Sequence, residues 1–202
     1  NLANKFILSG DSKCALVIGA ETLSRITDWE DRNTCVLFAD GAGAAILKPS
    51  EDPGIIYSKL GANGAYSDLL YVPYGTSKRP LKDQRNDNFL QMKGNEVFKV
   101  AVKTLESIAK DSLKEVNMTS EDIDWFIPHQ ANIRIIQAVS KRLNIPEKKV
   151  IISLADHGNT SAASIPLALD QSIREGKIKT GDTVLLQSFG AGFTWGTVII
   201  KI

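Results

Sequence analysis

The sequence is poor in the side chains that bind metals or form covalent cross-links. Its 202 residues include two cysteines, Cys14 and Cys35, and two histidines, His129 and His157. Two cysteines are too few for a disulfide scaffold or a zinc knuckle, and these four residues show no metal-ligand spacing. Both cysteines stand in short apolar runs, where a buried free thiol is expected. We therefore predict no metal site and no disulfide framework.

The sequence also lacks a long apolar run and an excess of charge of either sign. No stretch approaches the roughly 18 apolar residues of a membrane span, and residues 1–10 do not have the pattern of a signal peptide. Lysine and arginine total 24 against 23 aspartates and glutamates, a formal net charge of +1. This balance favours neither nucleic acid nor a membrane surface as a partner, so we expect a cytoplasmic protein.

The remaining composition is that of a globular chain. Hydrophobic residues make up 43% and charged residues 23%, enough apolar side chain to exclude disorder along the whole chain. The sequence begins without methionine, and residues 2–8 are typical of the last turns of a helix that ends at Gly10. We expect that processing or truncation removed an upstream segment.

Short apolar runs predict strands in the first part of the chain, and residues 61–90 predict an extended, irregular excursion with a short hairpin. After Gly94 the apolar period becomes helical, and helices alternate with strands. Pro166 falls inside one of these helices, where it should bend the helix or cost one hydrogen bond. This alternation predicts a layered α/β fold with helices on a sheet. The expected strands are 15–19, 35–38, 41–47, 55–60, 124–128, 150–152, 183–188 and 197–202, and the expected helices are 95–116, 130–143 and 160–175.

The scarce histidines point to one place for acid–base chemistry. His129 follows a strand that ends at Pro128 and precedes a helix, which is the edge of an α/β sheet where ligands bind. A helix N-terminus would keep the imidazole neutral, and a neutral imidazole can donate a hydrogen bond to an oxyanion or enolate. A purely structural histidine at a helix start remains the alternative.

Two further segments carry possible hydrogen-bond donors. Asn159 lies among small residues at another helix start, where its amide can donate to a carbonyl oxygen or simply cap the helix. His157 is expected to be a structural loop residue. The loop 189–193 can offer backbone N–H groups to an oxyanion, although a tight hairpin explains it equally well.

Basic side chains fall on two predicted helices. Arg134 and Lys141 are two helical turns apart and share a face. Arg142 is on the same predicted helix, 130–143, and Lys99 is on the predicted helix 95–116. Such residues form either a solvated face or a site for an acidic partner. No serine has the G-x-S-x-G setting of an activated nucleophile.

Five motifs in order resemble the β-ketoacyl-[acyl-carrier-protein] synthase III family: FADGAGAAIL, GNEVFKVAV, IPHQAN, HGNTSAASIPLAL and SFGAGFTWG. The resemblance runs from about residue 3 to the C-terminus. It implies a thiolase-like layered α/β/α/β/α sandwich of two similar halves, in a homodimer. Residues 1–50 would end the N-terminal half, residues 51–90 form the irregular excursion and connection, and residues 91–202 form the C-terminal half.

The resemblance also implies an activity and roles for individual residues. Family enzymes condense an acyl-CoA primer, often acetyl-CoA, with malonyl-acyl-carrier protein, which initiates fatty acid synthesis without a cofactor beyond the CoA thioester substrates. His129 and Asn159 match the family's catalytic donors, and Ala191 matches a second oxyanion donor. Arg32 matches a residue that packs on the CoA adenine, and Phe98, Ala131 and Asn132 match the lining of the pantetheine tunnel. The carrier-protein surface would comprise Lys99, Arg134, Lys141 and Arg142.

The main departure concerns the family's nucleophilic cysteine. By the family pattern it falls a few residues before Asn1, and Cys14 and Cys35 are not substitutes for it. We therefore expect that this chain cannot condense by itself. The leading hypothesis is the C-terminal part of a condensing enzyme, and the alternative is a non-catalytic CoA- or carrier-binding module. A thiolase-like condensing enzyme with another primer is disfavoured by the FGAGFTWG ending.

Overall fold

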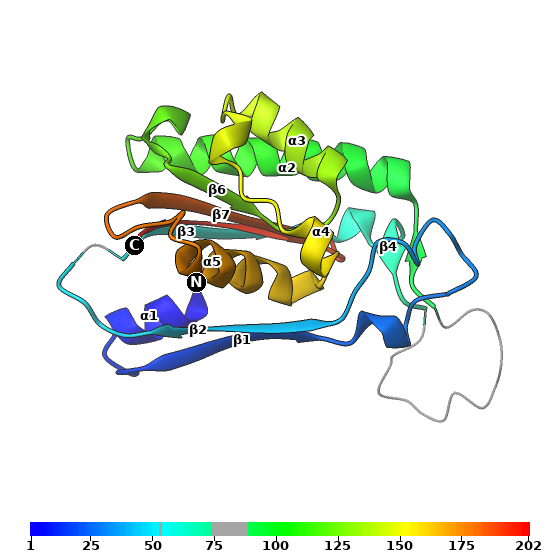
Figure 1. The fold of residues 1–202 in the computed structure, drawn as a ribbon, viewed down its shortest axis with the longest axis horizontal. Helices are drawn as coiled ribbons and strands as arrows, with labels where there is room; N and C mark the ends of the chain where they lie inside the picture. Colours follow the sequence, from blue (N-terminus) through cyan, green and yellow to red (C-terminus); the bar gives the residue numbers. More distant parts are fainter. Residues whose placement is uncertain (53, 74–88) are drawn as a thin grey trace.

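The computed structural model describes residues 1–52, 54–73 and 89–202. Its elements form layers (Figure 1): helices α2 (Gly94–Glu115) and α3 (Ile133–Arg142) cover one face of a four-stranded sheet, and α5 (Ser164–Arg174) covers the other. A ribbon of β1 (Ala15–Glu21) and β2 (Gly41–Leu47) lies beyond α5. The prediction of a layered α/β fold is confirmed.

The four-stranded sheet has the order β3 (Ile55–Ala62), β8 (Thr194–Lys201), β7 (Thr183–Gly190) and β6 (Trp125–Pro128). The pair β6–β7 is parallel and the other two pairs are antiparallel. A parallel pair needs a long crossover, and here the crossover contains α3, α4 (Leu154–His157) and α5. The predicted strand 150–152 is wrong, because Val150 makes only one isolated bridge, to Phe126.

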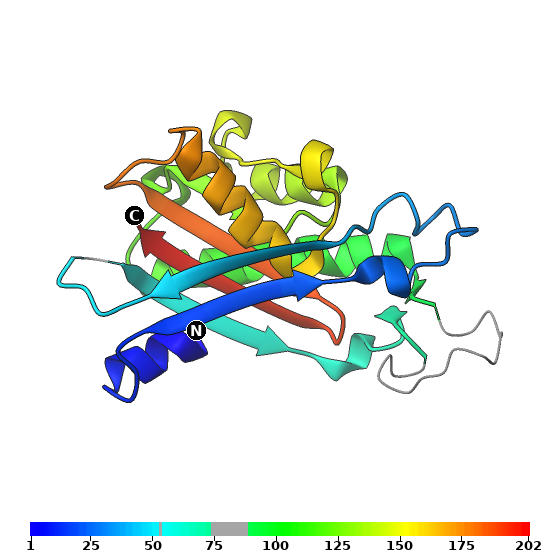
Figure 2. The same cartoon turned by 60° about the horizontal axis from the view of Figure 1, so that its bottom comes forward.

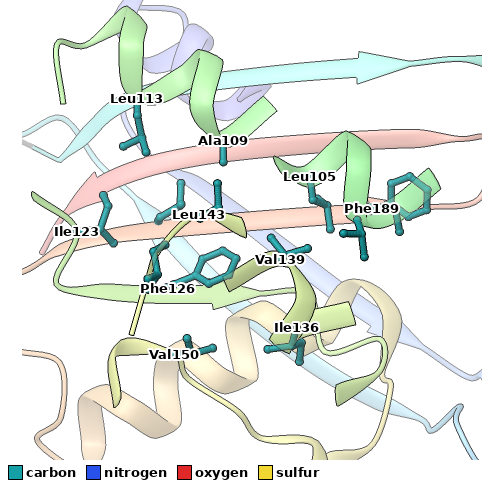
Figure 3. Close-up of a cluster of buried hydrophobic side chains, with 14 of the residues drawn as sticks. Leu105, Ala109, Leu113, Ile123, Phe126, Ile136, Val139, Leu143, Val150 and Phe189 are labelled. Carbon is teal, nitrogen blue, oxygen red and sulfur yellow. The ribbon is translucent and has the colours of Figure 1, made fainter. Parts of the chain in front are cut away.

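Helix α2 has the amphipathic pattern that its sequence predicted. Val97, Ala101 and Leu105 recur every four residues and are buried, so one stripe of the helix faces the sheet. Figure 3 shows this core, in which Phe126 of β6 lies below α2 and beside Val139 of α3. These contacts hold the two outer helices and the sheet together as one packed unit.

A smaller core lies on the other face of the sheet, where Ile127 and Val184 pack with Ala168 of α5. Helix α5 begins at Ser164 after the 3-10 turn η6 (Ser161–Ala163). Pro166 therefore stands in the first turn, where an N–H has no intrahelical partner in any case. Pro166 lies inside a helix, as predicted, but the helix starts at Ser164 rather than at residue 160. The position in the first turn removes the reason to expect a bend or a lost hydrogen bond.

The β1–β2 ribbon packs against η6 and α5 through close backbone contact (Figure 2). A Cβ on Gly19 would collide with the main chain of Ala162, and one on Gly43 would come within 2.9 Å of Pro166 Cγ. Before the ribbon, α1 (Leu2–Leu8) is followed by Gly10 at φ +84°, as the sequence predicted. After β1 comes the 3-10 turn η1 (Leu23–Arg25).

Two expectations about the first 50 residues are wrong. Residues 35–38 form turns rather than a strand, with a single bridge from Phe38 to Asn159. Cys14 is exposed and Cys35 is half-buried, because no described element covers the outer side of the ribbon and its flanking turns. The apolar runs predicted that both segments are buried. Burial also requires another element to pack on them, and an apolar run does not show whether one does.

The irregular excursion contains the 3-10 turn η2 (Gly64–Tyr66) and the short antiparallel pair β4 (Leu70–Tyr71) and β5 (Gln91–Met92). Half of the predicted excursion 61–90, residues 74–88, lies outside the described residues. Two further 3-10 turns are η4 (Ser120–Asp122) and η5 (Glu147–Lys149). The division at residues 50 and 90 stays a prediction, although β3 of the middle segment pairs with β8. Within the described ranges, no helix is long and apolar enough to cross a membrane.

Candidate active site

A cavity of about 1520 Å³ opens where strands β6 and β7 end and helices α2 and α3 begin. His129, Asn159 and Ala191 all line it, so the structure brings together the three groups that the sequence singled out as hydrogen-bond donors. They come from three different segments: the loop after β6, the loop before η6, and the β7–β8 hairpin. The carboxyl end of a parallel strand pair is a common position for ligand binding.

His129 is held at both its main chain and its ring. Its N–H donates to Gln187 O at 2.7 Å, and its Nδ1 lies 2.6 Å from Ser164 Oγ. Burial lowers the pKa of His129 to about 4, because a charged imidazolium loses its hydration there. The imidazole is thus neutral at pH 7, as predicted. The cause of the lowered pKa is desolvation by burial, whereas the sequence analysis expected the N-terminus of a helix to keep the imidazole neutral.

Helix α3 begins three residues later than predicted, and this places the histidine on a loop. The side chain of Asn132 caps the helix by accepting a hydrogen bond from Arg134 N at 2.8 Å. Gln130, fully buried, donates to Pro128 O and Ile151 O. These bonds fix the loop between β6 and α3.

Asn159 is 6% exposed, and its main chain is clamped by residues of the first region. It donates to Leu37 O at 3.0 Å and accepts from Ala39 N at 2.9 Å. Its side-chain Oδ1 accepts from Ser161 N at 3.0 Å. Since the oxygen is engaged with the backbone, the amide nitrogen Nδ2 is the end left to donate into the cavity.

Ala191 stands at the tip of the β7–β8 hairpin, which is anchored from two sides. Phe193 exchanges backbone hydrogen bonds of 2.8 Å with Asn63. Its ring is fully buried and packs against Phe189 and Tyr66. Gly192, at φ +133°, adopts a conformation that side-chain-bearing residues rarely take. A fixed hairpin presents its main chain to the cavity in a constant orientation, which is what an oxyanion donor requires.

The other residues singled out by the family resemblance divide into two groups. Phe98, Ala131, Asn132 and Arg134 line the cavity. Arg32 is exposed between Asp31 and Asn33, which do line it. Outside the lining are Lys99, Lys141 and Arg142. The binding roles of all these residues stay predictions.

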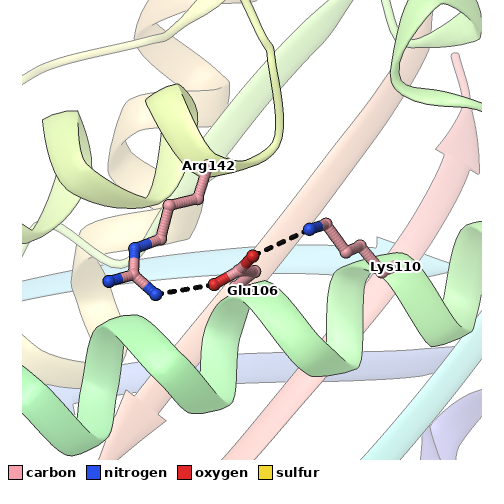
Figure 4. Close-up of polar contacts among 3 residues, drawn as sticks. All are labelled: Glu106, Lys110 and Arg142. Carbon is pink, nitrogen blue, oxygen red and sulfur yellow. Dashed lines mark hydrogen bonds and ion pairs between the residues drawn. The ribbon is translucent and has the colours of Figure 1, made fainter.

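Arg142 already has a partner within the chain. Its Nη1 lies 2.8 Å from Glu106 on α2, and Lys110 binds the other oxygen of the same carboxylate at 2.7 Å (Figure 4). Hydrogen bonds from Lys110 and Arg142 hold the pKa of Glu106 below its ordinary value. This pairing joins α2 to α3 at the surface, so an acidic partner would have to compete with Glu106 for Arg142.

Sequence reasoning missed the apolar wall of the cavity and the partner of the histidine. Phe189, Trp195 and Met92 belong to this wall, and a Cβ on Gly61 would collide with the Trp195 indole. Gly61, Trp195 and Phe189 meet because β3, β8 and β7 are neighbours in the sheet, whereas Met92 comes from β5. No local sequence pattern reveals these neighbours. Ser164 belongs to the HGNTSAAS motif, five residues after Asn159, but the motif alone did not indicate its contact with His129.

Within the described residues, no group of three or more histidine, cysteine, aspartate or glutamate side chains could hold a metal ion. Neither Cys14 nor Cys35 lines the cavity. The cavity therefore offers neutral hydrogen-bond donors and an apolar wall, an arrangement suited to stabilising negative charge on an oxygen of a bound substrate.

Comparisons with known proteins agree on one family. Residues 1–64 match the family model described as 3-Oxoacyl-[acyl-carrier-protein (ACP)] synthase III, and residues 113–202 match the model of its C-terminal part. The chain is 52% identical over 200 residues to the Beta-ketoacyl-[acyl-carrier-protein] synthase III of Thioalkalivibrio sulfidiphilus, of which it covers 62%. It thus spans less than two thirds of the length of such relatives.

Solved structures give the same result for the fold. The crystal structure of 3-oxoacyl-[acyl-carrier-protein] synthase III from Aquifex aeolicus matches the whole chain with a TM-score of 0.91 at 45% identity, and 62% of that protein is covered. The corresponding protein from Thermus thermophilus matches with a TM-score of 0.91 at 42% identity, with 63% covered. The thiolase-like α/β fold implied by the sequence motifs is confirmed.

Proposed function

This chain belongs to the 3-oxoacyl-[acyl-carrier-protein] synthase III family, and from that premise we propose that its cavity performs the malonyl half of a decarboxylative condensation. The full protein would join an acyl group from acyl-CoA, such as acetyl-CoA, to malonyl-acyl-carrier protein and initiate fatty acid synthesis. The observation that carries the proposal is the convergence of His129 and Asn159 on one cavity, each with a donor for which no partner occurs among the described residues.

In the proposed reaction, negative charge develops on an oxygen that these donors would bind. When the carboxylate of malonyl thioester leaves as CO₂, the electron pair of the broken C–C bond moves into the thioester and gives an enolate. His129 Nε2–H and Asn159 Nδ2–H would donate to that enolate oxygen. A neutral imidazole suits this role, because it stabilises the charge without transferring a proton to it.

The enolate carbon then attacks the carbonyl of the acyl group, which family enzymes hold as a thioester on a cysteine. The new C–C bond forms and the thiolate leaves. The oxyanion of that step differs from the enolate, and the main chain at Ala191 would hold it. Since Cys14 and Cys35 lie outside the cavity lining, neither is proposed as this nucleophile.

The pantetheine arm that the substrates share would lie along the apolar part of the cavity. Phe98, Ala131 and Asn132 would contact it, and Arg32 would pack on the adenine of CoA. Lys99, Arg134, Lys141 and Arg142 would bind the acidic carrier protein. A homodimer in the cytoplasm completes the proposal, on the basis of the family resemblance.

The test separates the two half-reactions in the full-length protein that contains this chain. We expect His129→Ala and Asn159→Ala each to lower CO₂ release from labelled malonyl-acyl-carrier protein by about 100- to 1,000-fold, the usual cost of removing one such donor. Transfer of a labelled acetyl group from acetyl-CoA should stay measurable in both variants. Loss of acetyl transfer with decarboxylation retained would contradict the proposed roles.

His157→Ala is the matched control for the histidine variant. His157 is the other histidine of the chain, it closes α4, and it does not line the cavity. Both half-reactions should keep their normal rates in this variant. A loss equal to that of His129→Ala would mean that the assay reports folding rather than the donor.

A further inference from the structure

The ring of His129 has one partner among the described residues, and that partner is itself buried. Ser164, at the first position of α5, is 2% exposed. Its Oγ lies 2.6 Å from Nδ1 of the imidazole. No described residue lies within hydrogen-bond distance of Nε2 of the same ring, and His129 lines the cavity. The two ring nitrogens thus have different surroundings, one inside the protein and one free for a ligand.

The direction of the Ser164–His129 hydrogen bond follows from counting donors and acceptors. A serine hydroxyl has one hydrogen to donate and two lone pairs that accept. Gln130 N donates to Ser164 Oγ at 3.3 Å, which occupies one lone pair. In the described part of the chain, Nδ1 is the one acceptor within reach of the Ser164 hydroxyl. A buried hydroxyl keeps its hydrogen paired, so it donates to Nδ1.

We propose that Ser164 is a positioning residue that fixes His129 in the tautomer carrying its proton on Nε2. If Nδ1 accepts the serine hydrogen, Nδ1 has no hydrogen of its own, and the proton of the neutral ring must be on Nε2. The N–H then faces the cavity. The alternative tautomer would present a lone pair to the cavity and repel an anionic oxygen there.

Further hydrogen bonds fix the positions of Ser164 and His129 relative to each other. Gln130, next to the histidine, also accepts from Ser153 N at 2.9 Å through its side-chain oxygen. The loop that carries His129 is therefore hydrogen-bonded to the segment that leads to α4. The backbone N–H of Gln130 donates to Ser164 Oγ. The catalytic consequence rests on the proposed function, whereas the tautomer is a property of the protein that can be measured without substrate.

The direct test is nitrogen NMR of the imidazoles in the full-length protein labelled with ¹⁵N-histidine. Within this chain, only His129 and His157 contribute, and His129→Gln assigns the signals. We expect a protonated Nε2 and a bare Nδ1 for His129 in the unmodified protein at pH 7. In Ser164→Ala the Nδ1-protonated form should appear, and Ser164→Thr, which retains a hydroxyl, should suppress it. A proton on Nδ1 in the unmodified protein overturns the proposal.

A kinetic measurement distinguishes positioning from general destabilisation. Ser164→Ala should lower kcat for malonyl decarboxylation by about 10- to 100-fold, the range found when a group that orients a metal-binding histidine is lost, with KM nearly unchanged. Ser164→Thr should recover much of the rate. Ser112→Ala is the matched control, since Ser112 is fully buried on α2 and its hydroxyl has no partner in the described structure.

The two proposals fail in different ways. If His129→Ala leaves decarboxylation intact, the proposed function is wrong, but the NMR result still decides the tautomer. If Ser164→Ala leaves the ring protonated on Nε2 alone, the positioning role is wrong even when His129 is essential. An equal loss of rate in Ser112→Ala and Ser164→Ala would also overturn it.

Discussion

The first 50 residues and the C-terminal region from Gly94 onward are built in opposite ways. Every buried apolar side chain of the described residues lies between Val97 and Ile199. By contrast, nine of the fifteen large apolar side chains that are exposed belong to the first 50 residues, among them Leu16, Ile18 and Ile46 of the ribbon. The C-terminal region thus has its own core, while the ribbon depends on what lies against it.

The cavity lies at the boundary between these regions, and its two donors differ accordingly. His129 is fixed by Gln187 and Ser164, both within the packed C-terminal region. Asn159 is clamped by Leu37 and Ala39 of the first region. The position of the imidazole therefore depends on the packed core of the C-terminal region, whereas that of the amide depends on a segment with little core of its own.

The sharpest test of this difference compares two apolar truncations in the 202-residue chain. Phe126→Ala empties a fully buried site between α2, α3 and the sheet and should cost about 3–5 kcal/mol of the free energy of unfolding. Ile18→Ala changes a side chain that is 62% exposed and should stay within about 0.5 kcal/mol. Urea unfolding measures both, and equal costs would abolish the distinction between the regions.

A second test acts on the boundary itself. Gly19→Ala places a methyl group against the main chain of Ala162, so the ribbon or η6 must shift, at a cost of about 1–3 kcal/mol. In the full-length protein, decarboxylation should fall with it, because η6 begins two residues after Asn159. Gly54→Ala is the control, since a Cβ there meets nothing within 4 Å. Normal stability and rate in Gly19→Ala would show that the two regions are not coupled there.

Much of the fold followed from the sequence because its signals are local. The four-residue period of α2 predicted its bounds within one residue, and short apolar runs located β1, β2, β7 and β8. The errors arose where tertiary contacts decide. The run 35–38 has the composition of a strand, yet only Phe38 finds a bridge partner. The predicted start of α3 missed the side-chain cap at Asn132.

The candidate site shows the same limit. His129, Asn159 and the loop around Ala191 could be singled out because each combines a donor with a position at an element's end. Their meeting in one cavity, and the pairing of Ser164 with the imidazole across 35 positions of sequence, depend on how the layers stack. The exposure of Cys14 likewise depends on a covering layer, about which its apolar neighbours carry no information.

The smallest expected effect concerns the surface pairs that join α2 to α3, and it asks whether charge or core stabilises the C-terminal region. Glu106→Gln removes the carboxylate that Lys110 and Arg142 share. Since exposed ion pairs contribute little and are screened by salt, the unfolding midpoint should fall only slightly at pH 7. Glu115→Gln, on the same helix, is an exposed control for which no ion pair occurs among the described residues.

The pH dependence identifies the cause of that small effect. The pKa of Glu106 is lowered in the folded protein, first by the Lys110 hydrogen bond and then by Arg142. Its contribution is therefore complete above the ordinary carboxyl pKa of 4.5 and is lost as the pH falls through the lower folded-state value. The difference between the unmodified chain and Glu106→Gln should vanish in acid and shrink in high salt. A difference in stability that persists in acid would instead assign the effect to packing of the Glu106 side chain between the helices. The C-terminal region would then be stabilised by contacts between neutral groups at its surface as well as in its core.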